Sequence, residues 1–204
     1  MTFGIEMRVT WIRISFLVAA LLLTPAAQAE TANANVSWDL PQLMQSLAQV
    51  KSAKNKFTER KYLSLLDQPL LTSGKLVYTA PAHLEKLTLT PKPETMVLDG
   101  DRLSLDIKGK RRTLSLQNYP LLWAFVESIR GTLAGDLPVL KRFYRVDLEG
   151  DAAQWQLLLM PTDPEVREVV REIRIGGKRN RVLSVEVLEV QGDRSVMTIT
   201  EDGA

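Results

Sequence analysis

The chain has 204 residues, of which 45% are hydrophobic and 25% are charged, which is ordinary for a folded globular protein. Its 26 Lys and Arg residues nearly balance its 24 Asp and Glu residues, so the net charge is only +2. This balance gives no argument for a nucleic-acid partner. Cysteine is absent and histidine occurs once, which excludes disulfide bonds, thiolate metal sites, cysteine nucleophiles and metal sites with several histidines.

The first 29 residues have the pattern of a secretory signal peptide. Arg8 and Arg13 flank the start of an apolar run over 14–23, and Ala27-Gln28-Ala29 matches the small residues before a cleavage site. The run is about ten residues long, too short to cross a bilayer of roughly 30 Å. We expect cleavage after Ala29 and a single mature domain over residues 30–204. Export without cysteines fits the periplasm of a Gram-negative bacterium better than eukaryotic secretion.

One amphipathic helix is predicted near the start of the mature chain. Asp39 has the chemistry of an N-cap, and Pro41 suits the first helical turn. The apolar residues that follow recur at helical spacing; they are Leu40, Leu43, Met44, Leu47 and Val50. This spacing predicts a helix over about 40–52 with one apolar face.

After this helix the period of the sequence changes to two. Apolar and polar residues alternate in short runs over 75–80, 86–90, 103–108, 113–116, 154–159, 173–175, 183–187 and 197–199. Turn-forming residues separate the runs, among them Asp99-Gly100-Asp101 and Gly176-Gly177. The pattern predicts an antiparallel sheet with one buried face, and a sheet of eight or more strands must curl, close or fold on itself.

Residues 119–142 interrupt the strand pattern. An apolar helical stripe follows Tyr119-Pro120, Gly131 and Gly135 interrupt the stripe, and Asp136 can cap a second short helix. Two interpretations remain open. The helices could cover the open side of a curved sheet, or they could complete an ordinary core, which composition alone favours.

The sequence contains no recognised catalytic motif. It has no glycine-rich phosphate loop, no Gly-x-Ser-x-Gly elbow and no metal-ligand spacing. A hydrolase would have to use His83 with Asp99 and Asp101, but Asp-Gly-Asp is first of all turn chemistry. We therefore expect no enzyme activity, no metal and no cofactor.

The remaining pattern is apolar and distributed along the chain. A curved sheet lined with Leu, Met and aromatic side chains under a helical cover would suit an acyl chain. Each buried methylene contributes about 0.8 kcal/mol, so a chain of about a dozen methylenes supplies roughly 10 kcal/mol before ordering costs. Packed protein cores have the same composition.

In their order, the motifs resemble those of the outer membrane lipoprotein carrier (LolA) family. After the amphipathic helix the matching series includes Phe57-Thr58-Glu59, the run over 73–78, the run over 97–103, Trp155-Gln156-Leu157 and Ile173-Arg174-Ile175. The resemblance covers nearly all of residues 38–200. It implies a mainly β fold with some helix: an unclosed antiparallel β-barrel, or half-barrel, with a helical lid and an N-terminal helix. It also implies a soluble shuttle that carries lipoprotein acyl chains from an inner-membrane donor transporter to an outer-membrane acceptor.

The chain departs from the family pattern at Ala80. Family carriers usually have an Arg just before the proline that Pro81 matches, and that Arg reaches into the cavity and holds the lid closed. We therefore expect a divergent member, which could serve another lipid or glycolipid. The sequence does not show whether Arg112 or Arg130 replaces the missing Arg.

The predicted site is a set of apolar side chains without a catalytic group. The residues expected to line the cavity are Phe57, Leu76, Tyr78, Leu87, Leu89, Met96, Leu98, Leu103, Leu105 and Trp155. The residues expected to form the lid are Leu121, Leu122, Trp123, Phe125 and Ile129. The face of each strand is inferred from alternation, and a shift of one residue would exchange the faces.

Three functional hypotheses follow. The first is a monomeric periplasmic carrier that binds acyl chains of lipoproteins or a related lipid and needs no nucleic acid. The second is an interaction or assembly module of the cell envelope that has the same fold and transports nothing. The third is the hydrolase that would use His83, Asp99 and Asp101, and it has the least support.

Overall fold

The structure is a computed structural model that describes residues 38–202. The predicted signal peptide, its cleavage site and the segment up to residue 37 lie outside the described residues. None of the helices within residues 38–202 is long and apolar enough to span a bilayer.

Helix α1 (Leu40–Ala48) begins where the sequence predicts. The carboxylate of Asp39 accepts a hydrogen bond of 2.9 Å from the backbone N–H of Gln42, which satisfies one of the unpaired donors of the first turn. The helix ends earlier than predicted because the carbonyl of Lys51 already accepts a hydrogen bond of 2.9 Å from the N–H of Ala80. The chain is therefore held by the sheet from this point on.

Within residues 38–202, eleven strands form one antiparallel sheet. The first half contains β1 (Ser52–Tyr62), β2 (Leu70–Thr79), β3 (His83–Thr90), β4 (Glu94–Asp99), β5 (Arg102–Ile107) and β6 (Lys110–Ser115). The second half contains β7 (Tyr144–Asp151), β8 (Gln154–Pro161), β9 (Val170–Lys178), β10 (Arg181–Glu189) and β11 (Arg194–Glu201). In each half, strands that follow one another in sequence pair side by side, and the halves join where β1 pairs with β11.

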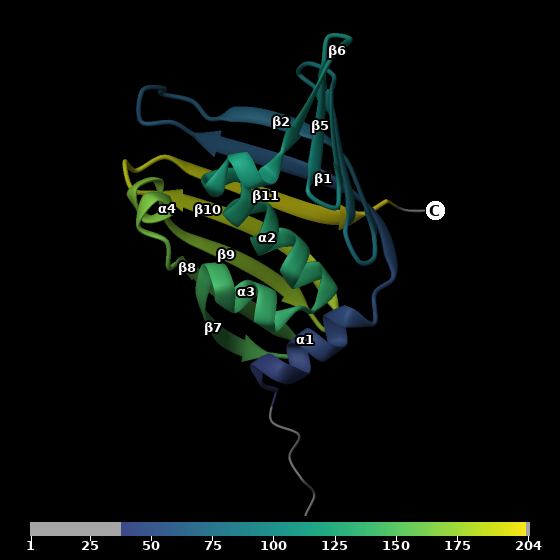
Figure 1. Ribbon diagram of the computed structural model, residues 1–204, viewed down its shortest axis with the longest axis vertical. Helices are drawn as coiled ribbons and strands as arrows, with labels where there is room; N and C mark the ends of the chain where they lie inside the picture. Colours follow the sequence, from purple (N-terminus) through teal and green to yellow (C-terminus); the bar gives the residue numbers. More distant parts are fainter. Residues whose placement is uncertain (1–37, 203–204) are drawn as a thin grey trace, which may run out of the picture. The chain divides into compact units, whose positions relative to one another are not determined.

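The sheet is curved but not closed into a barrel (Figure 1). Its strand order begins at β6 and ends at β7, and within the described residues these two strands do not pair with each other. The register shifts between β2 and β3 and between β9 and β10. Such irregularities increase the local twist of a sheet. This architecture confirms the predicted fold class, a mainly β, unclosed antiparallel sheet with an N-terminal helix.

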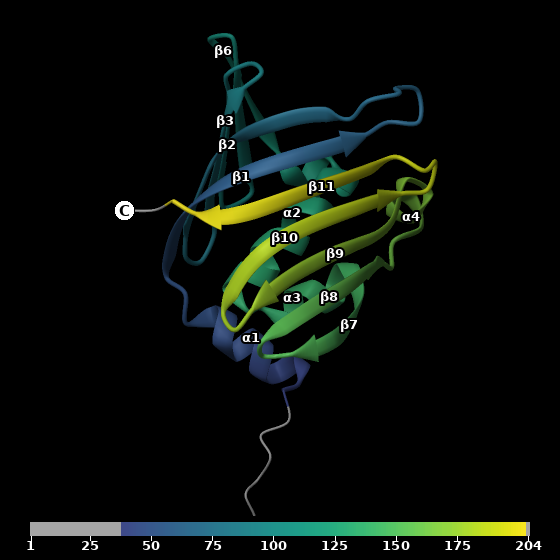
Figure 2. The same ribbon diagram turned by 180° about the vertical axis from the view of Figure 1, so that it is seen from behind.

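The segment between the two edge strands crosses one face of the sheet. It contains a short 3₁₀ turn, helix α2 (Pro120–Ala134) and helix α3 (Leu137–Phe143). Figure 1 shows α2 and α3 in front of the strands, and Figure 2 shows β1 and β8–β11 uncovered on the other side. Helix α4 (Pro164–Val169) connects β8 to β9.

In the helical segment, the helix ends predicted at Gly135 and Asp136 are confirmed, but the interruption predicted at Gly131 is wrong. Asp136 caps α3 by accepting a hydrogen bond of 3.0 Å from the N–H of Val139. Gly135 ends α2 in the left-handed conformation, with φ at 66°. Gly131, however, lies inside α2, where a Cβ atom would come within 3.0 Å of the Leu140 side chain. This glycine lets α2 and α3 approach each other.

Two clusters of buried side chains hold the structure together. In the larger cluster, residues of α1 such as Leu43 pack against residues of strands β7–β10 such as Leu157. The smaller cluster packs α2, through Val126, against Leu98 and Leu103 of β4 and β5. The two halves of the sheet therefore have separate cores.

The prediction of a turn at Gly176-Gly177 is wrong, because both residues lie inside β9. A Cβ atom at Gly177 would come within 2.2 Å of the Trp155 ring. The indole of Trp155 lies over this strand and donates a hydrogen bond of 2.8 Å to the carbonyl of Arg179. The two glycines provide room for the neighbouring side chains rather than a change of chain direction.

Replacing Gly177 by Ala should therefore destabilise the protein. The added methyl group would collide with the Trp155 ring and with the carbonyl of Arg181, and overpacking of this kind costs about 1–3 kcal/mol. Gly176→Ala is the matched control, since its closest neighbour, at 2.6 Å, is the movable hydroxyl of Ser184. Urea unfolding should give a clearly larger loss of stability for Gly177→Ala. Equal losses would contradict this account of the glycine pair.

Candidate functional site

A cavity of about 670 Å³ lies between the inner face of the sheet and helix α2. Its volume falls within the range of about 300–1,000 Å³ that is typical of small-molecule sites. Both halves of the sheet contribute apolar side chains to its wall, including Leu98 and Leu103 from one half and Ile175 and Val185 from the other. The cavity therefore adjoins both buried clusters.

Several of the residues predicted for the cavity do line it. Leu76 and Tyr78 of β2, Met96 and Leu98 of β4, and Leu103 of β5 are all part of the wall. Tyr78 pairs with Leu84, Leu84 with Leu98 and Leu98 with Leu103, so these side chains form a continuous row on the inner face.

Three other predicted residues lie on the inner face of the sheet without lining the cavity. Phe57 is only 2% exposed and lies under the ammonium group of Lys86, which is 4.9 Å from its ring centre. Leu105 packs against the smaller cluster. Trp155 is buried in the larger cluster, where its place is fixed by Gly177 and its hydrogen bond to the Arg179 carbonyl.

The prediction that Leu87 and Leu89 face the cavity is wrong. Lys86 pairs with Leu76 and Met96 across the neighbouring strands, so it is Lys86 that faces inward. Leu87 and Leu89 consequently lie on the outer face, where they are 37% and 48% exposed. Alternation assigns the wrong face here because the inward position holds a charged residue with a partner inside the protein.

Of the five predicted lid residues, Phe125 and Ile129 line the cavity from α2. Leu122 and Trp123 instead pack against the smaller cluster, and the Trp123 ring meets the Phe143 ring edge to face at 5.5 Å. Leu121 is 39% exposed. The helix therefore presents only part of its predicted apolar stripe to the cavity.

The cavity wall also contains an ion pair, which joins Lys86 to Glu59 at 2.6 Å. The Glu59 carboxylate accepts further hydrogen bonds from the hydroxyls of Ser195, at 2.7 Å, and Thr72, at 3.4 Å. These four residues come from β1, β2, β3 and β11, and sequence reasoning missed the pair because 27 positions separate its members. The side chains of Glu59 and Lys86 are only 20% and 26% exposed.

Burial and hydrogen bonding act in opposite directions on Glu59. Desolvation raises the pKa of the Glu59 carboxyl, but the charge of Lys86 and the hydrogen bonds from Lys86, Ser195 and Thr72 together hold this pKa below its ordinary value of 4.5. Glu59 is therefore ionised at neutral pH and provides a fixed negative charge beside the Lys86 ammonium.

Tyr78 lines the cavity with its ring, while its hydroxyl is buried away from the cavity surface. Tyr78 is 4% exposed, and its hydroxyl oxygen has no hydrogen-bond partner among the described residues. Burial raises the pKa of Tyr78 above its ordinary value, so the hydroxyl keeps its proton and remains a donor.

The residues considered for hydrolysis make other contacts. The His83 ring lies 2.8 Å from the Glu85 carboxylate, and Asp101 accepts a hydrogen bond of 3.2 Å from Gln117. His83 and Asp99 are directly paired across β3 and β4. In the part of the chain that the structure describes, no group of three or more His, Cys, Asp or Glu side chains could hold a metal ion.

A family model described as "Outer membrane lipoprotein carrier protein LolA-like" matches residues 31–202. This chain belongs to the LolA-like family. The resemblance drawn from the motif order is thereby confirmed. No curated protein matches the sequence significantly.

Solved structures with a similar arrangement are distant from this LolA-like protein. The LolA superfamily protein NE2245 of Nitrosomonas europaea is 11% identical with a TM-score of 0.40, over 79% of this chain and 93% of that one. LprF of Mycobacterium bovis is 9% identical with a TM-score of 0.34, over 80% and 93%. The structure of the Pseudomonas aeruginosa MucA/MucB complex is 13% identical in sequence with a TM-score of 0.46. The match covers 80% of this chain but only 56% of that one. Likenesses this weak carry no argument about function.

Arg130 occupies a position from which it can hold α2 against the sheet. Its guanidinium donates a hydrogen bond of 2.7 Å to the carbonyl of Gly100, in the turn between β4 and β5. It also pairs with Glu127, whose side chain is only 3% exposed and which accepts a bond of 2.9 Å from the Trp123 indole. Arg112 lies on β6, is exposed and pairs with Leu105 in the sheet. The structure therefore favours Arg130 over Arg112 as the link between helix and sheet.

The Glu59–Lys86 pair should make part of the stability dependent on pH. A carboxyl whose pKa is lowered on folding contributes stability that is present above its unfolded pKa, near 4.5, and is lost as the pH falls through the folded value. As the pH falls below about 4.5, we expect the wild type to lose stability relative to the double variant Glu59→Gln/Lys86→Met, which has no carboxyl to protonate at this position.

The single variant Lys86→Met completes this test. It leaves the Glu59 carboxylate half-buried without its ammonium partner, so at neutral pH it should be less stable than the double variant by about 1–3 kcal/mol. The measurement is the free energy of urea unfolding of the wild type, the single variant and the double variant at several pH values. A stability difference that does not change with pH would contradict the assigned pair.

Proposed function

We propose that this LolA-like protein is a periplasmic carrier that holds the acyl chains of lipoproteins, or of a related lipid, in the cavity under α2. The observation that carries the proposal is the cavity of about 670 Å³ with apolar walls from both halves of the sheet and from the crossing helix. The predicted signal peptide over 1–29 supports an exported protein.

The proposed mechanism is passive. The apolar wall removes the chains from water, at about 0.8 kcal/mol for each methylene, and no covalent step is needed. Transfer then requires an acceptor that binds the chains more strongly than the carrier does. In this proposal the donor is an inner-membrane transporter and the acceptor lies at the outer membrane, as the family resemblance implies.

The Lys86 ammonium in the cavity wall suits the polar end of an acylated molecule. The Lys86 ammonium retains donors beyond the one directed at Glu59. An apolar pocket with a few placed polar groups is the usual design of a ligand site.

Phe125→Glu tests the cavity directly. A carboxylate at this position of the wall should weaken the binding of a fluorescent fatty-acyl probe by more than about tenfold, because the acyl chain would have to bury a charge. Leu87→Glu is the matched control, since Leu87 and Phe125 are both 37% exposed but Leu87 lies on the outer face.

Both variants should unfold at urea concentrations close to that of the wild type, which shows that the fold is intact. Probe binding that is unchanged in Phe125→Glu, or equally weakened in both variants, would reject the cavity as the acyl site. A wild type that binds no acylated molecule would instead favour the interaction module.

The link made by Arg130 should control the rate of acyl-chain entry. Glu127→Gln/Arg130→Met removes the bond to the Gly100 carbonyl without leaving a buried carboxylate unpaired. We expect faster uptake and faster release of the probe in stopped-flow fluorescence, each by severalfold. Lys141→Met, on the exposed surface of α3, is the control. Rates equal to those of the wild type would show that Arg130 does not hold α2 closed.

A further inference from the structure

Two projecting hairpins lie at the same end of the sheet. Strands β1 and β5 run in the same direction, because β1 to β5 pair in succession and each pair is antiparallel. The β1–β2 loop and the β5–β6 turn therefore occur at one end, toward the top of Figures 1 and 2. Their side chains differ sharply in chemistry.

The β1–β2 loop and the first two residues of β2 carry exposed leucines, which we call the apolar tip: Leu65, Leu66, Leu70 and Leu71. Leu65 is 93% exposed, and the other three are between 47% and 56% exposed. The loop is also tied to the neighbouring turn, since the N–H of Ser64 donates a hydrogen bond of 2.8 Å to Asp193. A cluster of leucines held in water by an anchored loop is typical of a surface that contacts another apolar phase.

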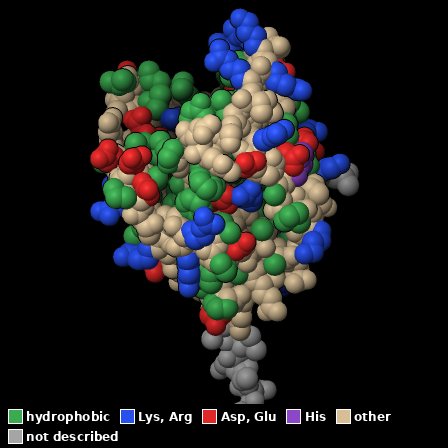
Figure 3. Space-filling model, in the orientation of Figure 1, with side chains coloured by type: hydrophobic (Ala, Val, Ile, Leu, Met, Phe, Trp, Pro, Cys, Tyr) green, Lys and Arg blue, Asp and Glu red, His purple; other side chains and the backbone are tan. Residues whose placement is uncertain are grey.

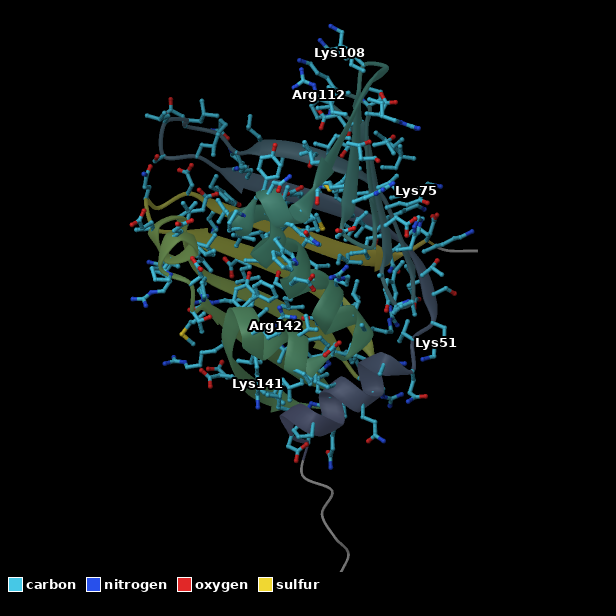
Figure 4. All side chains as sticks on the ribbon, viewed as in Figure 1. Lys51, Lys75, Lys108, Arg112, Lys141 and Arg142 are labelled. Atoms are coloured by element: carbon cyan, nitrogen blue, oxygen red, sulfur yellow. The ribbon has the colours of Figure 1, made fainter. Side chains whose placement is uncertain are left out.

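The β5–β6 hairpin carries exposed basic residues, which we call the basic tip: Lys108, Lys110, Arg111 and Arg112. None of them takes part in an ion pair with another residue of 38–202. The neighbouring carboxylate of Asp106 instead accepts a hydrogen bond of 3.0 Å from the N–H of Gly109. In Figure 4, Lys108 and Arg112 lie at the far end of this hairpin.

The space-filling view separates the two tips clearly. Figure 3 shows apolar side chains at the upper left, basic side chains at the top, and a notch between them. Because the tips are two separate projections, a broad, flat partner can meet both at once. A partner that fits a single groove would meet only one.

We propose that this end of the sheet docks on the surface of an anionic lipid bilayer. The apolar tip inserts leucine side chains at the level of the headgroups, and the basic tip binds lipid phosphates. Stable but reversible attachment to a membrane usually needs two such contributions, one apolar and one electrostatic. Each Lys or Arg at an anionic surface strengthens binding by about fivefold, so the four residues of the basic tip supply the required charge complementarity.

Docking of this kind is separable from cargo binding. No residue of either tip lines the cavity. The proposal therefore does not depend on the identity of the cargo, and it places the protein at a membrane surface, where a lipid carrier would have to load or unload.

Co-sedimentation with lipid vesicles tests the proposal. The wild type should bind vesicles of phosphatidylcholine that also contain phosphatidylglycerol, and should bind pure phosphatidylcholine vesicles much more weakly. Added salt should weaken the binding, because it screens exposed charges. Failure of the wild type to bind the anionic vesicles would overturn the proposal, and the tips would then be better explained by a protein partner.

Variants of each tip sharpen the test. Leu65→Ser/Leu66→Ser and Lys110→Glu/Arg111→Glu should each reduce binding to anionic vesicles by more than about tenfold. Lys141→Glu/Arg142→Glu is the control that makes the same change of charge on α3, away from the tips (Figure 4), and it should retain clearly more binding. Equal losses in this control and in the basic-tip variant would overturn the assigned surface.

The cavity variant distinguishes this proposal from the proposed function. Phe125→Glu should bind anionic vesicles like the wild type, since Phe125 belongs to the cavity wall and not to a tip. Loss of vesicle binding in this variant would mean that the cavity, and not the two tips, makes the membrane contact.

Discussion

The structure depends on one constraint: the two edge strands of the sheet, β6 and β7, are joined by a segment that must cross from one edge to the other. Within residues 38–202 these edges do not pair, so the curved sheet stays open. The crossing segment becomes α2 and α3 and lies over one face, as Figure 1 shows. Because the two halves of the sheet have separate buried clusters, the space between them and under α2 remains as a cavity. The candidate site follows from the connectivity rather than from any catalytic motif.

Charged pairs decide which side chains face this cavity and how it is covered. Glu59 and Lys86 place an ion pair on an otherwise apolar inner face and so direct Leu87 outward. Glu127 and Arg130 form a second pair at the covering helix, and Arg130 extends from it to the Gly100 carbonyl. Buried pairs of this kind contribute little net stability, but breaking one partner is costly. The first pair fixes Lys86 at the cavity wall, and the second links α2 to the turn between β4 and β5.

Local sequence patterns predict most of the fold but only part of the site. The cap at Asp39, the succession of short strands and the helical segment after Tyr119 depend on neighbouring residues, and sequence alone predicts them. The outward position of Leu87 depends on the partner that the adjacent Lys86 finds on another strand, and the close packing at Gly177 depends on Trp155. Contacts between distant parts of the chain have no local pattern, so the inner face of β3 and the contribution of β9–β11 to the cavity became evident only from the structure.

The central claim is that the cavity under α2 holds acyl chains, and native mass spectrometry of the protein isolated from the periplasm tests it most directly. Lipid extraction of the same sample identifies whatever is bound. The account predicts a bound acylated molecule whose mass is released on extraction. A protein that is isolated empty, and that also takes up no fluorescent fatty-acyl probe, would contradict the account.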